Sequence, residues 1–591
     1  MAIYVAFALL FGIVASSVTL LTKRALPTAS STSTKQSEAV SGKVMFMAAG
    51  SGIPEIKTIL SGFIISGFFD IKVIVVKAVG AVFAVSTGMC LGKEGPFVHI
   101  STAVGYQVAK RFPKYRYNGR VMREMLSASC ASGLSVAFGA PIGGVLFAYE
   151  EISTFFPRRV LLRAFLCSLC AAIVLKALNP TGTGRLVLFK TDYGTIYNPL
   201  HYLVFVVLGI AGGVFGGLFC KLNLLWSRWF RKYSIIKGYP VFEACLVVLV
   251  TALLQYPSPI IRETGDAVIK DLFTDCRDGS ADSWICRMED SGHDRWMYRG
   301  ALIYGTFTKL ALTTITFGVK VPSGVIIPAL DGGALFGRLM GQFFADVSPG
   351  IFAMVGAAAF LGGVSRMTIS LAVIMFELTG ELEYVVPQMI AILTSKWVAD
   401  AICKEGVYDV AQTVLEHPFL DLEHSTSILE RQGPYLVEEL IPPQQTMDEI
   451  TLTVPIDGKV SITVLQSKLW QLQERGLMDA GLVLVNEEGI MQGYFAQGEL
   501  ELALNNAEQV HPDDMSVKLF NDANDQELDI SRFIDRTPLS ISAKAPLEYA
   551  VEMFGKLGLR YLMVIEDESG RLIGVIIRKR LVAFLDKIKH E

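Results

Sequence analysis

The sequence predicts an all-α polytopic membrane protein with broken, tilted helices, followed by a soluble α/β tail. Of its 591 residues, 52% are hydrophobic and 18% are charged, and the mean hydropathy is +0.45, which is too apolar for one soluble globule. The 53 glycines fit this class, because small residues let membrane helices approach closely and permit breaks where the backbone lines a cavity. From about Lys404 onward long apolar runs stop and charge rises, which predicts a soluble domain.

The membrane part is divided into apolar stretches, several of which are shorter than the roughly 20 residues of a perpendicular span and are cut by Gly or Pro. This pattern is typical of transporters with discontinuous helices. The segment 143–150 has a faint counterpart in 370–377, which favours inverted repeats with the site between them, and we interpret Glu377 as structural. The stretches are Tyr4–Leu21, Ile71–Leu91, Met125–Tyr149, Val160–Leu175, Tyr202–Leu225, Val241–Leu254, Ala301–Val319, Val325–Phe344, Ile351–Phe376 and Tyr384–Cys403.

Loop charges predict the orientation. The segments 110–123 and 228–237 are rich in Lys and Arg, so they should face the cytosol, whereas the acidic segment 262–295 should lie outside or in a lumen. Cys276 and Cys286 share that acidic loop; they form a disulfide if the loop faces an oxidising compartment and stay free thiols otherwise. The Ser/Thr-rich segment Thr28–Ser41 is typical of a flexible loop. A formal net charge of −3 gives no reason to expect a nucleic-acid partner.

Three glycine-rich breaks have the composition of helix starts buried in the bilayer. They are Gly50–Glu55 (GSGIPE), Gly92–Pro96 (GKEGP) and Val321–Pro328 (VPSGVIIP). Each joins residues that permit unusual backbone to a proline near the first helical turn, and each precedes an apolar run. Free amides and the positive end of the helix dipole make such starts natural anion sites, although a single break of this kind is more often a packing kink.

These breaks carry a specific resemblance. GSGIPE, GKEGPFVHI at 92–100 and GAPIGGVLFAYEE at 139–151 are similar to signature segments of the CLC chloride channels and transporters, above all the intracellular eukaryotic exchangers. The resemblance covers nearly the whole chain. It implies a homodimeric membrane transporter in which each subunit has a complete pathway for chloride and protons, and it needs no cofactor.

The resemblance assigns the chloride site. It implies that Ser51, within Ser51-Gly52-Ile53, and Tyr408, from the last membrane helix, contribute hydroxyls to a central chloride. The break at Glu94-Gly95 and the backbone amides of Val325 and Ile326 should complete the site. Ile326 stands where phenylalanine is common, but the contact is by backbone N–H, so we expect the site to survive. A serine at position 51 fits chloride, whereas nitrate-preferring relatives tend to have proline there. Ser51 is expected to act as a helix N-cap as well.

Two glutamates are assigned to gating and proton transfer. A carboxylate in an apolar segment costs several kcal/mol if left charged and unpaired, so Glu94 should mark an ion or proton path. The resemblance makes Glu94 the external gate and Glu151 the internal proton acceptor. Most Glu-Glu pairs at helix ends are solvated, which is the alternative for Glu150 and Glu151. Because channel members typically lack an acid at position 151, its presence favours coupled exchange of chloride for protons over a voltage-gated passive chloride channel.

The tail resembles a pair of CBS domains. Two units each combine apolar strands around a Gly-containing turn with a charged helix, as in residues 562–565 and 571–577. Where nucleotide-binding relatives have a Tyr-Ser pair and an acidic residue, this chain has Asp479, Ala480 and Arg580. The aromatic stacker and the ribose-binding carboxylate are therefore missing, so we expect weak ATP binding and a structural or gating role.

The expected domains are a CLC transmembrane domain at 1–403, a linker with the end of the last membrane helix at 404–440, a first CBS unit at 441–507, a linker at 508–526 and a second CBS unit at 527–591. The resemblance implies that a first helix and an N-terminal segment are missing. We expect a multi-pass protein of an endosome, Golgi or vacuole membrane, with cytosolic CBS units. A membrane-tethered nucleotide sensor is a further alternative. An enzyme is disfavoured because no nucleophile–base constellation, metal site or phosphate loop is found.

Overall fold

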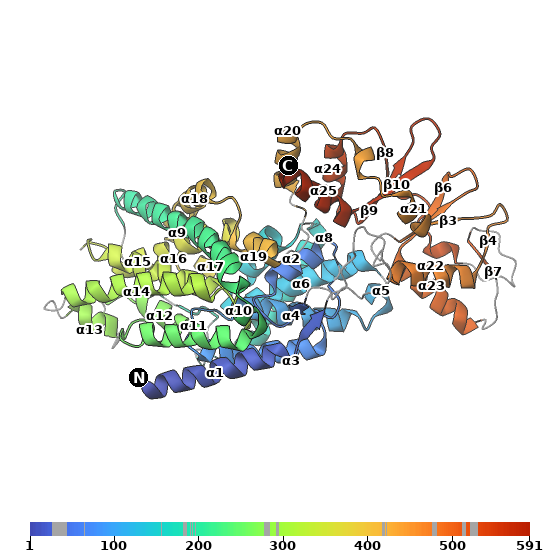
Figure 1. The fold of residues 1–591 in the computed structure, drawn as a ribbon. Helices are drawn as coiled ribbons and strands as arrows, with labels where there is room; N and C mark the ends of the chain where they lie inside the picture. The colour runs from blue at the N-terminus through green and yellow to red at the C-terminus, as the bar shows by residue number, and fades with distance from the viewer. Residues whose placement is uncertain are drawn as a thin grey trace.

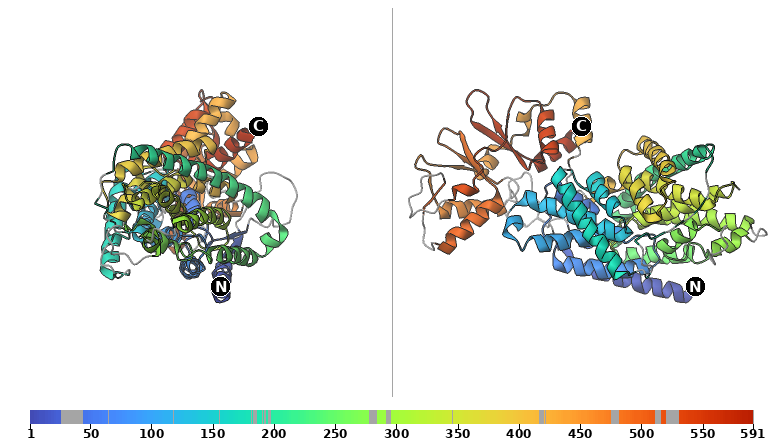
Figure 2. Two further views of the ribbon diagram at one scale, coloured as in Figure 1. Left: turned by 90° about the vertical axis from the view of Figure 1, so that its left-hand side faces the viewer. Right: turned by 180° about the vertical axis from the view of Figure 1, so that it is seen from behind.

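The computed structural model consists of a helical body and a smaller α/β tail at one end of it (Figures 1 and 2). It describes all residues except 26–43, 64, 117, 155, 181, 183–185, 190, 192, 195–196, 277–283, 291–294, 345, 416–419, 421, 475–480, 511–515, 520–529 and 591. The expected flexible loop Thr28–Ser41 lies outside the described residues. Strands β1 (Lys23–Ala25) and β2 (Val44–Phe46) flank it and pair antiparallel.

Apart from this hairpin, the regular elements among the described residues of the body are all helices. By length and composition, four helical segments among the described residues can cross a membrane, namely Ala2–Leu20, Arg158–Leu178, His201–Lys232 and Val385–Leu415. The other helices are shorter or more polar, as the broken pattern predicts. The described helices of the body, spanning and shorter ones together, are α1 (Ala2–Leu20), α2 (Ile53–Leu60), α3 (Ile71–Ser86), α4 (Glu94–Ala109), α5 (Pro113–Arg116), α6 (Gly119–Phe138), α7 (Pro141–Phe147), the π-helical turn η1 (Ala148–Ile152), α8 (Arg158–Leu178), α9 (His201–Trp229), η2 (Phe230–Lys232), α10 (Ser234–Gly238), α11 (Pro240–Gln255), α12 (Gly265–Phe273), α13 (Trp284–Asp290), α14 (Arg295–Thr316), α15 (Ile326–Gly341), α16 (Pro349–Ser365), α17 (Ile369–Thr379), α18 (Val385–Ile402) and α19 (Val407–Leu415).

Two of the predicted apolar stretches each form two helices instead of one. The stretch 125–149 is divided between α6 and α7 at Gly139, and the stretch 351–376 is divided between α16 and α17 at Arg366. Both dividing residues have a positive φ, 66° and 67°, so each ends its helix in the left-handed conformation. The two halves of the body therefore break at matching places.

A pair of carboxylates joins these two halves reciprocally. Glu150, just after α7, accepts hydrogen bonds from the backbone N–H groups of Thr368 and Ser370 at 2.7 and 2.8 Å, at the start of α17. Glu377, within α17, accepts from the N–H groups of Ile142 and Gly143 at 3.1 and 2.7 Å, at the start of α7. The two glutamates occupy the same place in the predicted repeat. Glu377 is thus structural as expected, and the solvated reading of Glu150 is wrong.

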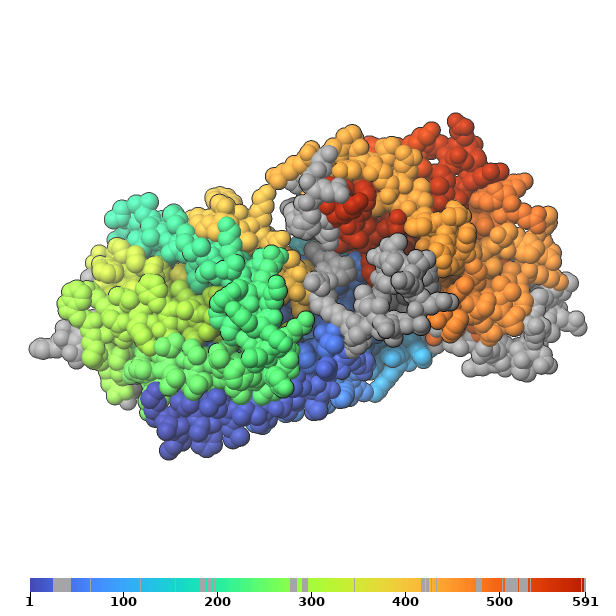
Figure 3. Space-filling view, in the orientation of Figure 1, coloured from blue at the N-terminus to red at the C-terminus, as the bar shows by residue number. Residues whose placement is uncertain are grey.

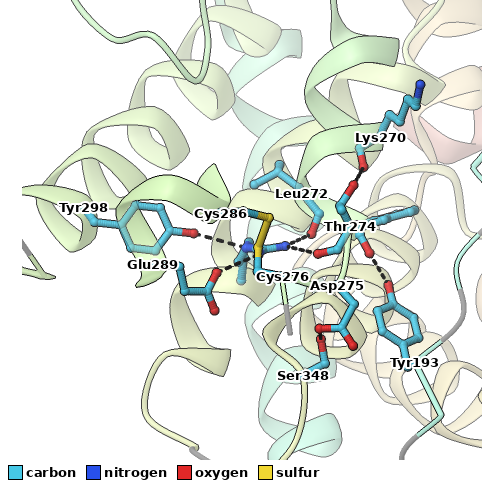
Figure 4. Close-up of a disulfide and its surroundings, with 12 residues drawn as sticks. Tyr193, Lys270, Leu272, Thr274, Asp275, Cys276, Cys286, Glu289, Tyr298 and Ser348 are labelled. Carbon is cyan, nitrogen blue, oxygen red and sulfur yellow. Dashed lines mark hydrogen bonds and ion pairs between the residues drawn. A yellow bond between two sulfur atoms is a disulfide. The ribbon is translucent and has the colours of Figure 1, made fainter. Parts of the chain in front are cut away.

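The far end of the body is held by a buried arginine and a disulfide. Cys276 and Cys286 are bonded, which confirms the oxidised alternative, and Figure 4 shows Tyr298, Glu289 and Leu272 gathered around them. Arg338 of α15 is fully buried here and donates to the Glu289 carboxylate at 2.7 Å, the Tyr298 hydroxyl at 3.1 Å and the Leu272 carbonyl at 2.5 Å. This network ties α12 and α13 to the end of α15.

The tail contains two copies of one β–α–β–β–α unit. In the first, β3 pairs parallel with β5, which pairs antiparallel with β6; in the second, β8, β9 and β10 repeat this pattern. The units join through backbone hydrogen bonds between Tyr494 and Asp535 at 2.8 and 2.9 Å. The elements are α20 (Leu422–Gln432), η3 (Val437–Leu440), α21 (Gln444–Ile450), β3 (Thr451–Thr453), β4 (Lys459–Ser461), α22 (Ile462–Glu474), β5 (Leu482–Val485), β6 (Met491–Phe495), α23 (Gln497–Val510), β7 (Ser516–Lys518), η4 (Ser531–Phe533), β8 (Ser540–Ser542), α24 (Leu547–Lys556), β9 (Tyr561–Ile565), β10 (Leu572–Ile577) and α25 (Arg578–His590).

The tail packs against one end of the body, opposite the disulfide. Figures 1 and 3 show the tail at one end of the long axis, while α13 marks the other end in Figure 1. Phe63, which follows α2, is 7% exposed and is part of the hydrophobic core of the second tail unit with Phe554 and Leu581. The basic segment 110–123 lies at this same end, so the side predicted to be cytosolic carries the tail.

The reciprocal caps give a stability prediction. We expect Glu377→Ala to lower the free energy of unfolding by about 1–3 kcal/mol, because two N–H groups at the start of α7, one of them partly buried, lose their acceptor. Glu377→Gln, which keeps one acceptor oxygen, should cost less. The measurement is the thermal unfolding midpoint of the purified chain in detergent, with the exposed Glu383→Ala as the matched control. Equal midpoints for Glu377→Ala and Glu383→Ala would contradict the capping role.

Candidate functional site

Three chain breaks meet at the centre of the body, and each is the start of a helix as predicted. Gly50 donates to the Val321 carbonyl at 2.9 Å and accepts from Ser323 at 3.1 Å, while Gly92 and Gly324 exchange two backbone hydrogen bonds of 2.8 Å. Just beyond these bonds, α2 starts at residue 53, α4 at 94 and α15 at 326. Because a helix start leaves its first amides without intrahelical partners, free donors from three helices are brought together here.

The α2 start contains the predicted residues Ser51, Gly52 and Ile53. Ser51 is 5% exposed and its hydroxyl accepts a hydrogen bond from the Ile53 N–H at 3.3 Å. The N-cap of α2 is Gly52, so the expectation that Ser51 acts as the N-cap is wrong by one residue. Gly52 has a φ of 82°, and a Cβ added to it would lie 2.7 Å from Nδ1 of His99. Only glycine fits this left-handed position under the His99 ring.

The α4 and α15 starts lie directly against Ser51. A Cβ added to Gly95 would be 2.5 Å from the Ser51 Cβ and 3.3 Å from the Ser323 carbonyl oxygen. Val325 and Ile326, each 2% exposed, begin α15. The structure therefore brings together the predicted residues of all three breaks, and Ile326 packs in the main core where the usual phenylalanine would stand.

Glu94 is the first residue of α4 and is completely buried. Its carboxylate lies over one glycine of its own break and one of a neighbouring break: a Cβ added to Gly92 would be 2.1 Å from Oε2, and one added to Gly324 would be 3.0 Å from it. Neither carboxylate oxygen has a hydrogen-bond partner of good geometry among the described residues. A buried, unpaired carboxylate is costly when charged, so this position favours an acid that moves or exchanges a proton.

Tyr408 lies between the two predicted glutamates. It belongs to α19, is 1% exposed, and its hydroxyl has no hydrogen-bond partner among the described residues. The hydroxyl is close enough to both Glu94 and Glu151 to interact electrostatically with each. The side chain of Gln412, one turn further along α19, donates to the Pro54 carbonyl at 3.2 Å, so α19 is fixed against the start of α2. Tyr408 is thus a core residue and not an interfacial anchor.

Glu151 lies in the π-helical turn η1 and is paired with a lysine that sequence reasoning missed. Lys57 of α2 contacts the Glu151 carboxylate at 3.2 Å and that of Asp409 at 2.8 Å. Asp409 follows Tyr408 directly, so one ammonium group joins the internal glutamate to the helix of the candidate chloride hydroxyl. The sequence could have indicated this role of Lys57 only through its positive charge on a short helix that is mostly buried.

A second missed pair lies near Glu94. Lys93, immediately before Glu94, contacts the Asp266 carboxylate of α12 at 2.5 Å, and both side chains are partly exposed. Further inside, Lys309 and Asp331 form a buried pair at 2.7 Å. Asp266, the acid paired with the residue just before the gate, therefore comes from the acidic segment 262–295, which the sequence indicated only as a topological marker.

The predicted nucleotide position is only partly described. Asp479 and Ala480 lie outside the described residues. Arg580 uses its guanidinium to bind the backbone carbonyls of Leu440 and Ile441, where the first tail unit begins. Arg580 thus links the two ends of the tail.

Family models match both parts of the chain: one described as voltage gated chloride channel matches residues 37–400, and one described as CBS domain matches residues 530–587. The chain belongs to the CLC family. It is 38% identical to "H(+)/Cl(-) exchange transporter 5" of Oryctolagus cuniculus and of Homo sapiens, in each case over 92% of this chain and 70% of the relative. It is 37% identical to "H(+)/Cl(-) exchange transporter 3" of Homo sapiens, with the same coverage.

Solved structures share the CLC fold. A eukaryotic CLC transporter aligns with a TM-score of 0.68 and 23% identity over 98% of this chain and 89% of that one. A slow cyanobacterial Cl−/H+ antiporter aligns with a TM-score of 0.56 and 21% identity over 70% of this chain and 88% of that one. The fold class predicted from the sequence, a CLC membrane domain with a paired CBS tail, is confirmed.

The contact between Gly95 and Ser51 gives a prediction for the site. We expect Gly95→Ala to reduce anion flux by about 10²-fold, because the added methyl group would push α2 and α4 apart. The measurement is anion efflux from liposomes containing the purified chain. Gly300→Ala is the matched control, since a Cβ there meets nothing within 4 Å. Flux through Gly95→Ala at the level of Gly300→Ala would show that this contact does not shape the pathway.

Proposed function

We propose that this chain exchanges chloride for protons across a membrane, with Glu94 as the external gate and Glu151 as the internal proton acceptor. The observation that carries the proposal is the buried carboxylate of Glu94, unpaired at the meeting point of three helix starts. The curated relatives at 37–38% identity are named exchange transporters for H(+) and Cl(−), which supports the same pair of substrates here.

The gate follows from the electrostatics of the helix starts. Free amides and helix dipoles favour one negative charge at the centre, and either the ionised Glu94 or a chloride ion supplies it. Protonation of Glu94 removes its attraction to the helix starts, so the side chain leaves and chloride enters. Because no more than partial positive charges hold the ion, chloride is bound weakly enough to be released.

The proton route requires a second acid on the other side of Tyr408. Glu151 fits this role, because its carboxylate lies on the same end as the tail and interacts with the Tyr408 hydroxyl. Lys57 holds Glu151 in place and stabilises its ionised form before a proton arrives. The Tyr408 hydroxyl, near both acids, donates a hydrogen bond to the bound chloride. In the half of the membrane body next to the tail, the proton and the chloride take separate routes.

The arrangement of charges supports an orientation with the tail in the cytosol and the disulfide in an oxidising lumen or outside. We propose an endosomal, Golgi or vacuolar membrane and a homodimer. All the assigned residues of one pathway come from a single chain, so each subunit would transport independently.

The test is coupled flux in liposomes. With an imposed chloride gradient, the wild type should drive protons uphill, and chloride efflux and internal pH are recorded together. Glu94→Ala and Glu151→Ala should each reduce proton movement by about 10²-fold or more, the scale expected for loss of a proton-transferring side chain, while chloride flux persists.

The matched control is Glu263→Ala, which removes an exposed acid three residues before Asp266. It should keep the coupling of the wild type. If the wild type moves chloride without protons, the chain is a passive channel and the role of Glu151 is wrong. If neither ion moves, the transport proposal itself fails.

A further inference from the structure

A cavity of about 630 Å³ lies between the membrane body and the CBS tail. Its body side is formed by the ends of α4 and α6 and by the loop after α2, and its tail side by both CBS units. This volume is within the range of small-molecule sites. Its body wall is strongly basic, with Lys110, Arg116, Arg120 and Arg123, and Arg560 adds a further cation from the tail.

Three arginines from the two parts converge at Gly62. A Cβ added to Gly62 would lie 2.9 Å from Nη1 of Arg123, 3.7 Å from Nη1 of Arg578 and 3.9 Å from Cγ of Arg560. Arg560 also reaches the start of α6, since a Cβ added to Gly119 would lie 2.9 Å from its Nη2. The positive end of this 20-residue helix and three guanidinium groups therefore face one region.

These arginines have no acid partner among the described residues. Arg578 is 5% exposed, and the Nε atoms of both Arg560 and Arg578 are buried without an acceptor. Burial, and then the charge of Arg560, lower the pKa of Arg578 to about 10. Buried like charges without a counterion are unfavourable, so the cluster has the features of a site that an anion completes.

The acidic side chains around the cavity either form ion pairs with other residues or lie on the wall opposite the arginines. Glu124 is buried and pairs with Arg159 and Arg163, and with Arg120 at 3.7 Å. Asp70 pairs with Arg24 at 2.6 Å. Glu499 and Glu501 line the side formed by the first CBS unit. Arg123 and Arg560 line this cavity, and Arg578 lines a small neighbouring pocket together with Arg120 and Arg123, so the three arginines form a positive region where the two spaces meet.

We propose that Arg123, Arg560 and Arg578 bind a phosphate monoester between the membrane body and the second CBS unit. A phosphate monoester carries nearly two negative charges and three acceptor oxygens, which match several guanidinium forks better than a single chloride does. The group belongs either to a lipid headgroup, because the site lies at the end of the membrane helices, or to a soluble phosphate ester.

The position of the site gives the ligand a route to the transport pathway. Gly62 and Phe63 follow α2, whose eight residues span about 12 Å and begin at Ile53, two residues after Ser51. Phe63 is fixed in the core of the second CBS unit. A phosphate bound at Gly62 would set the position of α2 between the tail and the chloride site. This regulatory consequence rests on the proposed function, whereas the binding does not.

The experiment is thermal unfolding of the full purified chain with two probes. Glycerol 3-phosphate is the soluble phosphate monoester. Phosphatidylcholine vesicles with added phosphatidic acid supply the lipid form, and vesicles with phosphatidylserine, a phosphodiester, are the control. We expect one monoester probe to raise the unfolding midpoint by at least about 2 °C. A response to glycerol 3-phosphate identifies a soluble ligand, and a response to phosphatidic acid alone identifies a lipid.

Variants show whether the response comes from this cluster. Arg560→Gln and Arg123→Gln should abolish the shift of the unfolding midpoint. Arg560→Lys keeps the positive charge but loses the two-pronged guanidinium geometry, so it should keep part of the shift. Arg571→Gln removes an exposed CBS arginine and should behave as the wild type. No shift with either monoester, an equal shift with phosphatidylserine, or an equal shift in Arg560→Gln would overturn the proposal. A chain that binds the probe but moves no chloride contradicts the proposed function alone.

Discussion

Backbone hydrogen bonds between three breaks in the membrane helices are the constraint on which the rest of the structure depends. Gly50, Gly92 and Gly324 exchange these bonds with one another or with the residues around Pro322, and this places the starts of α2, α4 and α15 in the middle of the body. Helices that start there cannot cross the whole membrane, so the fold needs many short elements. Their uncompensated amides also make the centre favourable for a negative charge, whether carboxylate or halide.

The helices α7 and α17 also begin with backbone N–H groups that lack an intrahelical acceptor, but there the chain supplies the acceptor itself. Each of these helices also starts within the body, but a glutamate from the opposite repeat fills the acceptor role permanently. The contrast between the two kinds of helix start is informative. Where a fixed carboxylate satisfies the donors the start is structural, and where the carboxylate is unpaired the start is available to an exchangeable anion.

The helix starts could be predicted from the sequence because glycine and proline act locally. Gly139, followed by a proline at N1 of α7, also carries a local signal for the end of α6. Arg366 carries no such signal for the end of α16, because a non-glycine residue rarely adopts a positive φ and nothing nearby in the sequence indicates that conformation. The apolar run through Arg366 therefore looked continuous.

Local sequence patterns could not predict the ion pairs of the site whose two members lie far apart in the chain. Lys57 and Asp409 are far apart in the chain and meet only because α19 packs on α2. The arginine cluster likewise needs the docking of a tail unit on the body. The resemblance to the CLC family supplied Ser51, Glu94, Glu151 and Tyr408, but it could not state which cations and acids surround them in this chain.

The disulfide between Cys276 and Cys286 is also a chemical record of how the chain was inserted. Charged loops bias orientation only statistically, but a disulfide forms and persists only where the compartment is oxidising. A copy inserted upside down would expose these two thiols to the reducing cytosol and leave the hydrogen bonds of Arg338 and the packing of α12 on α15 without the disulfide beside them. The same two residues therefore differ chemically between the two orientations, as a disulfide in an oxidising compartment and as thiols in the cytosol.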